Sequence, residues 1–293
     1  MKVSKVKKVV IPMAGLGTRM LPATKVLPKE MLPVAGKPII QLILKEALES
    51  GFSEIIFVIN KSKALVENFF DKNIKLEILL KNKSQNLLLR EIKDISKIKA
   101  NIVSVLQDKP KGLGHAITCA SPLLSGEAFA VMLPDMILDS NNRNNNLALM
   151  KKNFEKTGIS SILLGKAKKS DVQNYGIVKI NKRDRNNIFF PIENILEKPS
   201  PEKAPSNLFA VGRYIFENEI LSYLKREKPD SSGEIQLSGA ISNFLKDSNT
   251  INGLPLDGAI HDCGNKLGYL IANLAYSFKD PNFKKEVLKF IKK

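Results

Sequence analysis

The chain has 293 residues, 43% of them hydrophobic, and a formal net charge of +17. It is long enough for one large domain or two small ones, and it has no run of about 18 apolar residues, which excludes a membrane-spanning helix. The charge comes mainly from dispersed lysines and tryptophan is absent, so we expect a field that attracts small polyanions and no nucleic-acid partner.

The first half of the chain alternates apolar strands with amphipathic helices. Residues 8–13, KVVIPM, predict a buried strand. Their apolar run stops at Pro12 and is too short for a secretion signal, so we expect a cytoplasmic protein. Strands are also predicted at 54–60, 102–106 and 128–133, and helices at 39–50, 63–70 and 112–124. This order predicts an α/β fold with a Rossmann-like, mixed but mainly parallel sheet flanked by helices.

The second half has shorter strands and more polar connections. Residues 72–99 are rich in Leu and Lys, and we interpret them as a helical insertion, whereas residues 141–146 predict a polar loop. Further strands are predicted at 160–164, 176–180, 192–196 and 211–216, with a helix at 217–224 and a Lys-rich helical tail after residue 270. There is no internal repeat or long linker, so we expect one domain with insertions.

The chain has two cysteines, Cys119 and Cys263, and two histidines, His115 and His261. Their spacing gives neither a zinc site nor a disulfide framework. Each cysteine lies within four residues of a histidine, so a Cys–His nucleophile pair is one interpretation. Neither pair sits in a nucleophile turn, and two buried thiols in a reducing compartment fit the sequence better.

A glycine turn follows the first predicted strand directly. Gly15 and Gly17 at such a turn let backbone N–H groups approach a phosphate or a base edge. The turn is not a Walker A loop, because no Gly-Lys-Ser/Thr follows. It is not the dinucleotide fingerprint either, because Met20 stands where the third glycine belongs.

The turn continues as MLPATKVLPKEMLP. Its three prolines stiffen the segment and reduce the entropy that is lost when it becomes ordered. Arg19, Lys25 and Lys29 could then face a triphosphate. The alternative is a proline-rich surface loop with solvated charges, in which Lys25 could take part in a structural ion pair.

This segment resembles the signature of the sugar-1-phosphate nucleotidyltransferases, G-x-G-T-R-M-L-P-x-T-K-x-x-P-K-E-M-L-P, and its PKEMLP form resembles the bacterial UTP–glucose-1-phosphate uridylyltransferases of that family. Further blocks occur in the family's order: KGLGHA, LPD, EKP, VGRY, GEIQL and HDCGNKLGY. The resemblance covers nearly the whole chain and is weakest over 72–99 and the tail. It implies a GT-A-like fold in one domain spanning 1–293. Within it, a nucleotide-binding half covers about 1–135, a sugar-binding half about 136–270, and a helical tail 271–293.

The resemblance implies transfer of a uridylyl group from UTP to α-D-glucose 1-phosphate, giving UDP-glucose and pyrophosphate, with Mg²⁺ as cofactor. It also implies a homodimer or homotetramer. Three alternatives remain: a same-fold enzyme for another base or sugar, such as a thymidylyltransferase; a non-catalytic binding module; and a basic nucleic-acid-binding protein. The charged positions of the family are all kept, which argues against a non-catalytic module: Arg19, Lys29, Asp135, Lys198 and Asp262.

Two carboxylates are candidates for the metal. Asp135 comes just after the predicted strand 128–133, where ligand sites of parallel sheets gather, and carboxylate oxygens suit Mg²⁺. The resemblance gives Asp262 as its partner. Asp139 is a competing candidate that we expect to cap the following loop instead.

The remaining site residues are assigned by the resemblance, together with residue chemistry. Gln107 lies near the second glycine-rich turn, and its amide offers both a donor and an acceptor to a pyrimidine edge. The sugar phosphate is already an anion, so the reaction needs positioning and charge neutralisation rather than a general base. We expect catalytic roles for Arg19, Lys29 and Lys198; nucleotide contacts from Ala14, Gly15, Gly17, Thr18, Gln107 and Gly112; and sugar contacts from Tyr175, Gly176, Glu197 and Val211.

Overall fold

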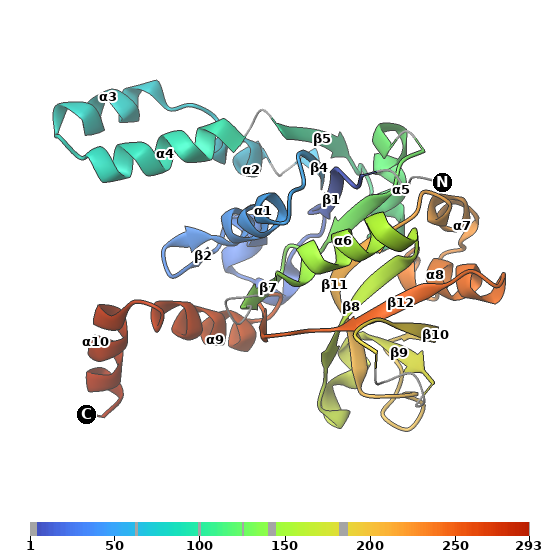
Figure 1. Cartoon of the computed structure of the whole chain (residues 1–293). Coiled ribbons are helices and arrows are strands. Elements are labelled where there is room, and N and C mark those ends of the chain that lie inside the picture. Colours follow the sequence, from blue (N-terminus) through green and yellow to red (C-terminus); the bar gives the residue numbers. More distant parts are fainter. Residues whose placement is uncertain are drawn as a thin grey trace.

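The computed structural model describes residues 5–61, 64–98, 101–124, 126–139, 145–181 and 187–292. A nine-stranded sheet runs through this part of the chain in the order β5-β4-β1-β6-β11-β8-β12-β10-β9 (Figure 1). Its strands are β1 (Lys8–Pro12), β4 (Glu54–Ile59), β5 (Ile102–Leu106), β6 (Phe129–Met132), β8 (Ser160–Lys166), β9 (Gly176–Ile180), β10 (Phe190–Glu197), β11 (Leu208–Phe216) and β12 (Ile251–Pro255). Two small antiparallel ribbons pair β7 (Met136–Asp139) with β13 (Ala259–Asp262), and β2 (Pro33–Val34) with β3 (Lys37–Pro38).

Strands β5, β4, β1 and β6 are parallel; β4, β1 and β6 are largely buried on both faces, whereas the edge strand β5 is partly exposed. Val9 and Ile11 pack with α1 (Ile39–Glu49) on one face, and Val10 packs with α5 (Gly112–Leu124) on the other. Successive strand residues point to opposite faces, so a strand covered by helices on both sides is apolar throughout. The predicted α/β fold is therefore confirmed, with helices on both faces of the sheet.

The other half of the sheet is mostly antiparallel. Strand β11 runs antiparallel to β6 and β8, and β10 runs antiparallel to β9 and β12, whereas β8 and β12 are parallel. The sheet is mixed as expected, but parallel pairing dominates only in its first half. In the second half β9, β10 and β11 follow one another without an intervening helix among the described residues, and such short returns favour antiparallel neighbours.

The remaining helices surround this sheet. They are α2 (Ala64–Phe69), α3 (Ile74–Asn82), α4 (Asn86–Ile98), α6 (Asn146–Thr157), α7 (Ile220–Arg226), α8 (Leu237–Lys246), α9 (Lys266–Ser277) and α10 (Pro281–Ile291). The predicted helical insertion forms the α3–α4 hairpin, and the helical tail forms α9 and α10; both project from the body on the same side in Figure 1. None of the described helices is long and apolar enough to cross a membrane.

Two helices, α6 and α8, escaped the sequence prediction. Residues 141–144 of the predicted polar loop lie outside the described residues, but Asn146 begins α6 and does not belong to a loop. The side chain of Asn145 accepts a hydrogen bond from the Ala148 N–H at 3.1 Å and caps the helix. The asparagine run therefore hid a helix start, because asparagine is both a loop residue and a favoured N-cap.

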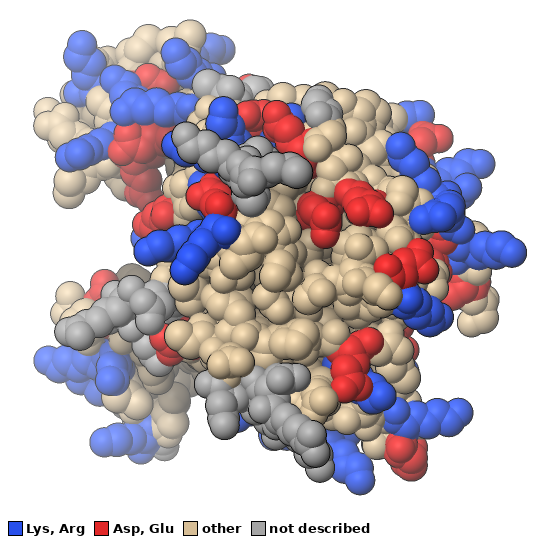
Figure 2. Space-filling view, turned by 45° about the vertical axis from the view of Figure 1, so that its right-hand side comes forward, with Lys and Arg blue, Asp and Glu red and all other residues tan. Residues whose placement is uncertain are grey.

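The basic residues are spread out on the face that Figure 2 shows. Figure 2 shows Lys and Arg around the edge of one face, interspersed with Asp and Glu, while other residues fill its centre. The Lys and Arg side chains therefore form no continuous stripe on this face, although the whole chain has a net charge of +17.

Candidate functional site

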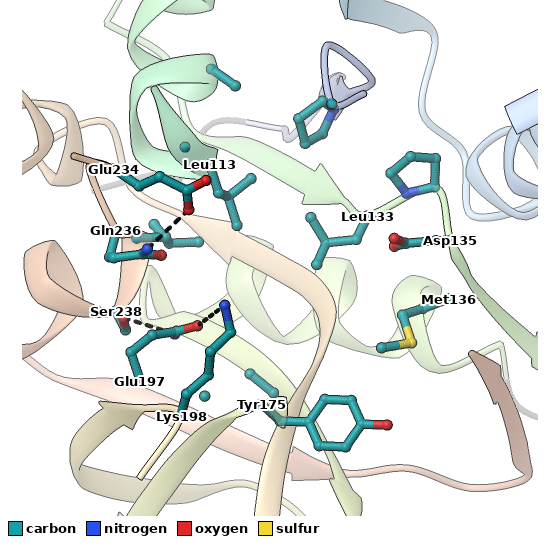
Figure 3. Close-up of a pocket in the computed structure, with 18 of the residues that line it drawn as sticks. Leu113, Leu133, Asp135, Met136, Tyr175, Glu197, Lys198, Glu234, Gln236 and Ser238 are labelled. Atoms are coloured by element: carbon teal, nitrogen blue, oxygen red, sulfur yellow. Dashed lines mark hydrogen bonds and ion pairs between the residues drawn. The ribbon is translucent and has the colours of Figure 1, made fainter. Parts of the chain in front are cut away.

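A cleft of about 390 Å³ opens where the parallel strands end (Figure 3). Ala14 and Gly15 follow β1, Gln107 follows β5, and Asp135 follows β6. The carboxyl ends of parallel strands meet at one edge of a sheet, which is where such folds bind ligands. The cleft brings together most of the predicted site residues: Ala14, Gly15, Arg19, Lys29, Gln107, Gly112, Asp135, Tyr175, Gly176, Glu197, Lys198 and Asp262.

Lys29 and Asp135 form an ion pair inside this cleft. The Lys29 Nζ lies 2.6 Å from Asp135 Oδ2, and each side chain is 17% exposed. Burial acts to lower the pKa of Lys29, but the carboxylates of Asp135 and Glu30 together outweigh it and the pKa is raised. Burial likewise acts to raise the pKa of Asp135, but Lys29 beside it holds that pKa below its usual value. Both groups are therefore charged at neutral pH.

Arg19, Asp135 and Asp262, which are far from one another in the sequence, converge on Gly264. A Cβ built on Gly264 would lie 2.9 Å from Asp262 Oδ1, 3.1 Å from Arg19 Nη2 and 3.1 Å from Asp135 Oδ2. The Gly264 N–H also donates a hydrogen bond to Asp262 Oδ1 at 2.8 Å. A side chain at position 264 would therefore collide with the charged groups, and glycine allows the two predicted metal ligands and Arg19 to meet.

The two carboxylates fit a magnesium ion. Hard cations take oxygen ligands, and Mg²⁺ is usually held by one or two protein carboxylates together with substrate phosphate oxygens and water. Among the described residues, no group of three or more His, Cys, Asp or Glu is placed to hold a metal. Asp139, the competing candidate, instead forms an ion pair with Lys279, whose Nζ lies 2.9 Å from Asp139 Oδ1. The loop that we expected Asp139 to cap lies outside the described residues.

A buried arginine fixes the turn that carries Asp135. Arg213 of β11 is fully buried, and its Nε and Nη2 donate to the two carboxylate oxygens of Glu46 at 2.9 and 2.7 Å. Its guanidinium also donates to the carbonyl oxygens of Leu133 at 3.0 Å and Met136 at 2.7 Å. These carbonyls flank Asp135 in the chain, so Arg213 holds the backbone on both sides of the carboxylate. The VGRY block therefore contributes an arginine that sequence reasoning had left without a role.

Glu197 and Lys198 lie on the wall across the cleft (Figure 3). Ser238 Oγ donates to Glu197 Oε2 at 3.0 Å, and Lys198 Nζ lies 3.8 Å from Glu197 Oε1. Lys198 has a positive φ of 44°, and its N–H donates to the Tyr175 carbonyl at 3.0 Å. A left-handed lysine is energetically unfavourable, and such backbone conformations concentrate at functional sites.

Tyr175 links this wall to the carboxylates. Its ring stacks on Phe209 with centroids 4.4 Å apart, and its hydroxyl donates to Asp262 Oδ2 at 3.4 Å. Burial, followed by the nearby Asp262 carboxylate, raises the pKa of Tyr175 to about 12, so the hydroxyl stays protonated. A Cβ on the adjacent Gly176 would lie 3.3 Å from Glu197 Oε2, which places that carboxylate close to the Gly176 backbone.

Four predicted residues do not line the cleft, and one of them is Lys25, which is exposed. Gly17 has a φ of +66° and shapes the turn, with Thr24 Oγ1 donating to its carbonyl at 2.8 Å, and the neighbouring Thr18 is exposed. Val211 is fully buried in the core, whereas Ala210 and Tyr214 face the cleft. The side chains of β11 alternate, with Ala210 and Tyr214 on the face of the cleft and Val211 on the opposite face.

The GEIQL block forms a wall that sequence reasoning did not assign. Glu234, Gln236 and Ser238 line the cleft, and Gln236 Nε2 donates to Glu234 Oε2 at 3.2 Å (Figure 3). A Cβ on Gly112 would lie 2.9 Å from Glu234 Cβ, so the second glycine turn packs directly against this wall. The alternating polar residues Glu234 and Gln236, just before the apolar helix α8, were the sequence signal that could have indicated this wall.

The cysteines do not support a nucleophilic role: Cys119 Sγ does lie 3.9 Å from His115 Nδ1 and Nε2, but neither residue lines the cleft. Burial raises the pKa of the Cys119 thiol, and it raises that of Cys263 to about 12. The described residues that line the cleft include neither histidine nor cysteine. Burial also lowers the pKa of both His115 and His261, which favours their neutral forms.

The chain is similar to known proteins over nearly its whole length. A family model described as nucleotidyl transferase matches residues 8–277. A relative from Haemophilus ducreyi, named UTP–glucose-1-phosphate uridylyltransferase, is 43% identical and covers 97% of this chain and 98% of its own. A UTP-bound UGPase from Acinetobacter baumannii is 38% identical, with a TM-score of 0.87 and 98% of each chain covered. A UDP-glucose pyrophosphorylase complexed with UDP-glucose is 34% identical, with a TM-score of 0.83 over 94% of this chain and 100% of that one.

Proposed function

The chain belongs to the nucleotidyl transferase family, and from this premise we propose that it transfers a uridylyl group from UTP to α-D-glucose 1-phosphate, giving UDP-glucose and pyrophosphate. One observation carries the proposal. A single cleft holds cations beside a glycine turn, a pair of carboxylates, and a polar wall with its own lysine. These are the groups that a nucleoside triphosphate, a metal ion and a sugar phosphate require.

The reaction is an in-line displacement. A phosphate oxygen of the sugar phosphate attacks the α-phosphorus of UTP, and the bond from that phosphorus to the β-phosphate oxygen breaks. Pyrophosphate leaves with the electron pair. The nucleophile is already an anion, so no general base is required, and the absence of histidine and cysteine from the described lining of the cleft is consistent with this.

Arg19 and Lys29 bind the leaving pyrophosphate, and Lys198 aligns the attacking phosphate against its repulsion from UTP. The 2.6 Å ion pair supports this role for Lys29, because Asp135 holds the ammonium inside the cleft before substrate arrives. Mg²⁺ would be held by Asp135 and Asp262, where it would neutralise charge on the phosphate oxygens. The hydrogen bonds from Gly264 and Tyr175 orient the Asp262 carboxylate for this purpose.

Recognition is divided between the two walls. Ala14 and Gly15 contact the nucleotide through their backbone, and Gly17 and Thr18 complete the turn. Gln107 and Gly112 contact the uracil. Tyr175, Gly176 and Glu197 meet the sugar, with Ser238 fixing the Glu197 carboxylate. Val211 supports this wall from the core and does not contact the sugar through its side chain.

We also propose that the chain forms a homodimer or homotetramer in the cytoplasm. The projecting helices expose large apolar side chains, which monomers seldom leave uncovered in contiguous groups: Ile74, Ile78 and Leu87 on the hairpin, and Phe283, Phe290 and Ile291 on α10. Cys119 and Cys263 are free thiols, which suits a reducing compartment. Light scattering of the purified chain measures the oligomeric state, and a monomeric mass would contradict self-association.

The activity is tested by measuring pyrophosphate release from a matrix of nucleoside triphosphates and sugar 1-phosphates with Mg²⁺. UTP with glucose 1-phosphate should give the highest kcat/KM. A preference for dTTP over UTP would instead assign the chain to the thymidylyltransferases. Absence of turnover with every pair, combined with salt-sensitive nucleic-acid binding, would support the basic nucleic-acid-binding protein that the net charge alone suggests.

A further inference from the structure

Two hydrogen bonds within the protein hold the side chain of Gln107, which is predicted to contact the uracil. It is 3% exposed and lies just after β5, at the edge of the cleft. Its Nε2 lies 3.2 Å from the Gly112 carbonyl oxygen and 2.9 Å from His115 Nδ1. Both partners belong to the first turn of α5.

These two contacts fix which way the amide points. A backbone carbonyl can only accept a hydrogen bond, so the Gln107 nitrogen and not its oxygen faces Gly112. The second N–H then points at His115 Nδ1, which must accept, and the neutral ring carries its hydrogen on Nε2. The lowered pKa of His115, caused by burial and by nearby Lys111, favours this neutral ring.

The amide oxygen is left for a ligand. Both N–H groups of Gln107 are used within the protein, and no hydrogen bond among the described residues involves Oε1. Uracil has a donor at N3, which matches an acceptor oxygen, whereas cytosine has an acceptor at N3 and would be repelled. If the amide could rotate freely, it would offer its N–H to cytosine as readily as its oxygen to uracil.

We propose that His115 is a positioning residue for base selection, whose Nδ1 lone pair locks the Gln107 amide so that the enzyme accepts uridine and rejects cytidine nucleotides. This inference rests on the proposed use of UTP. His115 does not line the cleft and is not a catalytic residue; it acts through Gln107. Gly112 alone supplies one acceptor, so the second acceptor from His115 is what suppresses rotation of the amide.

The test compares kcat/KM for UTP and CTP, which share the same ribose, in two variants of matched design. His115→Leu removes the acceptor, and the ratio of UTP to CTP should fall about tenfold, the effect of one hydrogen bond. His115→Asn can place its side-chain oxygen where Nδ1 lies, and the ratio should stay within about twofold of the wild type. Thr118→Ala, in the next turn of α5, is the control, because Thr118 Oγ1 donates to the Gly114 carbonyl at 2.9 Å and does not bond His115; it should keep the ratio unchanged.

A merely structural role for His115 would lower kcat/KM for both nucleotides together and leave the ratio intact, and that result would overturn the inference. The KM for glucose 1-phosphate serves as an internal reference and should not change. If the wild type itself does not use UTP, the proposed function fails before His115 is tested, so the two failures are distinguishable.

Nitrogen-15 NMR of the ring provides a test that does not depend on turnover or on the folding of His115→Leu. The chain has two histidines, so the His115 signals are identified by their loss in His115→Asn. The expected spectrum at neutral pH shows an unprotonated Nδ1 and a protonated Nε2. A ring protonated on Nδ1 would rule out the inferred hydrogen bond from Gln107.

Discussion

The ammonium of Lys29 lies 2.6 Å from a carboxylate oxygen of Asp135, a residue 106 positions further along the chain. The proposed leaving-group cation and the proposed metal ligand thus form one ion pair. Such a pair keeps two charges inside a confined cleft, because each satisfies the other until a polyanionic substrate competes for the lysine. Removing either residue therefore affects both roles.

Lys29→Met should lower kcat/KM by about 10²–10³, because it removes a charge that stabilises the transition state. It should also lower the free energy of unfolding by about 1–3 kcal/mol, less than for a fully buried pair since both side chains are 17% exposed. Lys97→Met, which breaks a surface pair with Asp94 at 2.8 Å, is the control and should change neither quantity. Steady-state kinetics and denaturant unfolding measure the two effects, and full activity in Lys29→Met would remove this lysine from the mechanism.

The stability difference between wild type and Lys29→Met should be constant around neutral pH and shrink in acid. The pKa of Asp135 is lowered in the folded state, so its contribution is present above the ordinary value of 3.8 and is lost as the pH falls through the lowered pKa. The pKa of Lys29 is raised, so its contribution is complete below the ordinary 10.5 and is lost only at higher pH. Unfolding measured at several pH values tests this, and a difference that declines between about pH 6 and 8 would contradict the assignment.

Asp135→Asn and Asp262→Asn should each raise the Mg²⁺ concentration for half-maximal activity by at least about tenfold, because each removes an anionic ligand. Asp139→Asn provides the matched control, since Asp139 pairs with Lys279 outside the cleft. Magnesium titrations of pyrophosphate release measure the effect. An unchanged titration for Asp262→Asn would leave Asp135 as the sole ligand of the pair.

Lys198→Ala should lower kcat/KM by about 10²–10⁴ with little change in the KM for UTP, because the lysine acts on the attacking phosphate. Lys198→Gly should be equally inactive but more stable than the alanine variant by about 1 kcal/mol, since the φ of 44° favours glycine. Kinetics and thermal unfolding of the pair separate the two contributions of this residue. Near-normal turnover in either variant would contradict the mechanism.

Arg213→Met should lower the free energy of unfolding by about 3–5 kcal/mol, because it leaves the Glu46 carboxylate without its buried partner. The double variant Arg213→Met with Glu46→Leu should recover only part of this loss, since the unpaired charge is then absent but the carbonyls of Leu133 and Met136 still lack their donor. Denaturant unfolding of the double-mutant cycle measures the coupling. Additive losses would show that the two residues act independently.

The sequence predicted the elements whose pattern is local. The apolar run 8–13 corresponds to β1, and Gly15, Arg19 and Lys29 lie in the cleft at the carboxyl edge of the sheet, as expected for a phosphate-binding turn. The second glycine turn also lies in the cleft, although its glycines are required partly by the close approach of Glu234 and Ile235.

Pairings between distant segments could not be predicted in the same way. The contact between Lys29 and Asp135, and that between Arg213 and Glu46, depend on tertiary packing that no spacing reveals. Val211 was assigned to the sugar pocket from the family resemblance alone, and its side chain lies on the face of β11 opposite Ala210 and Tyr214, buried in the core. Helix α8 was missed because the polar residues before it resemble an extended loop.

The Arg213 guanidinium also joins the active-site turn to the scaffold. It donates hydrogen bonds both to Glu46 of α1 and to the backbone carbonyls on either side of Asp135. The turn cannot loosen without exposing a buried cation, so it belongs to the same cooperative unfolding unit as the core. On heating, loss of turnover and loss of tertiary structure should therefore follow a single transition, with no separate inactivation of the site at a lower temperature.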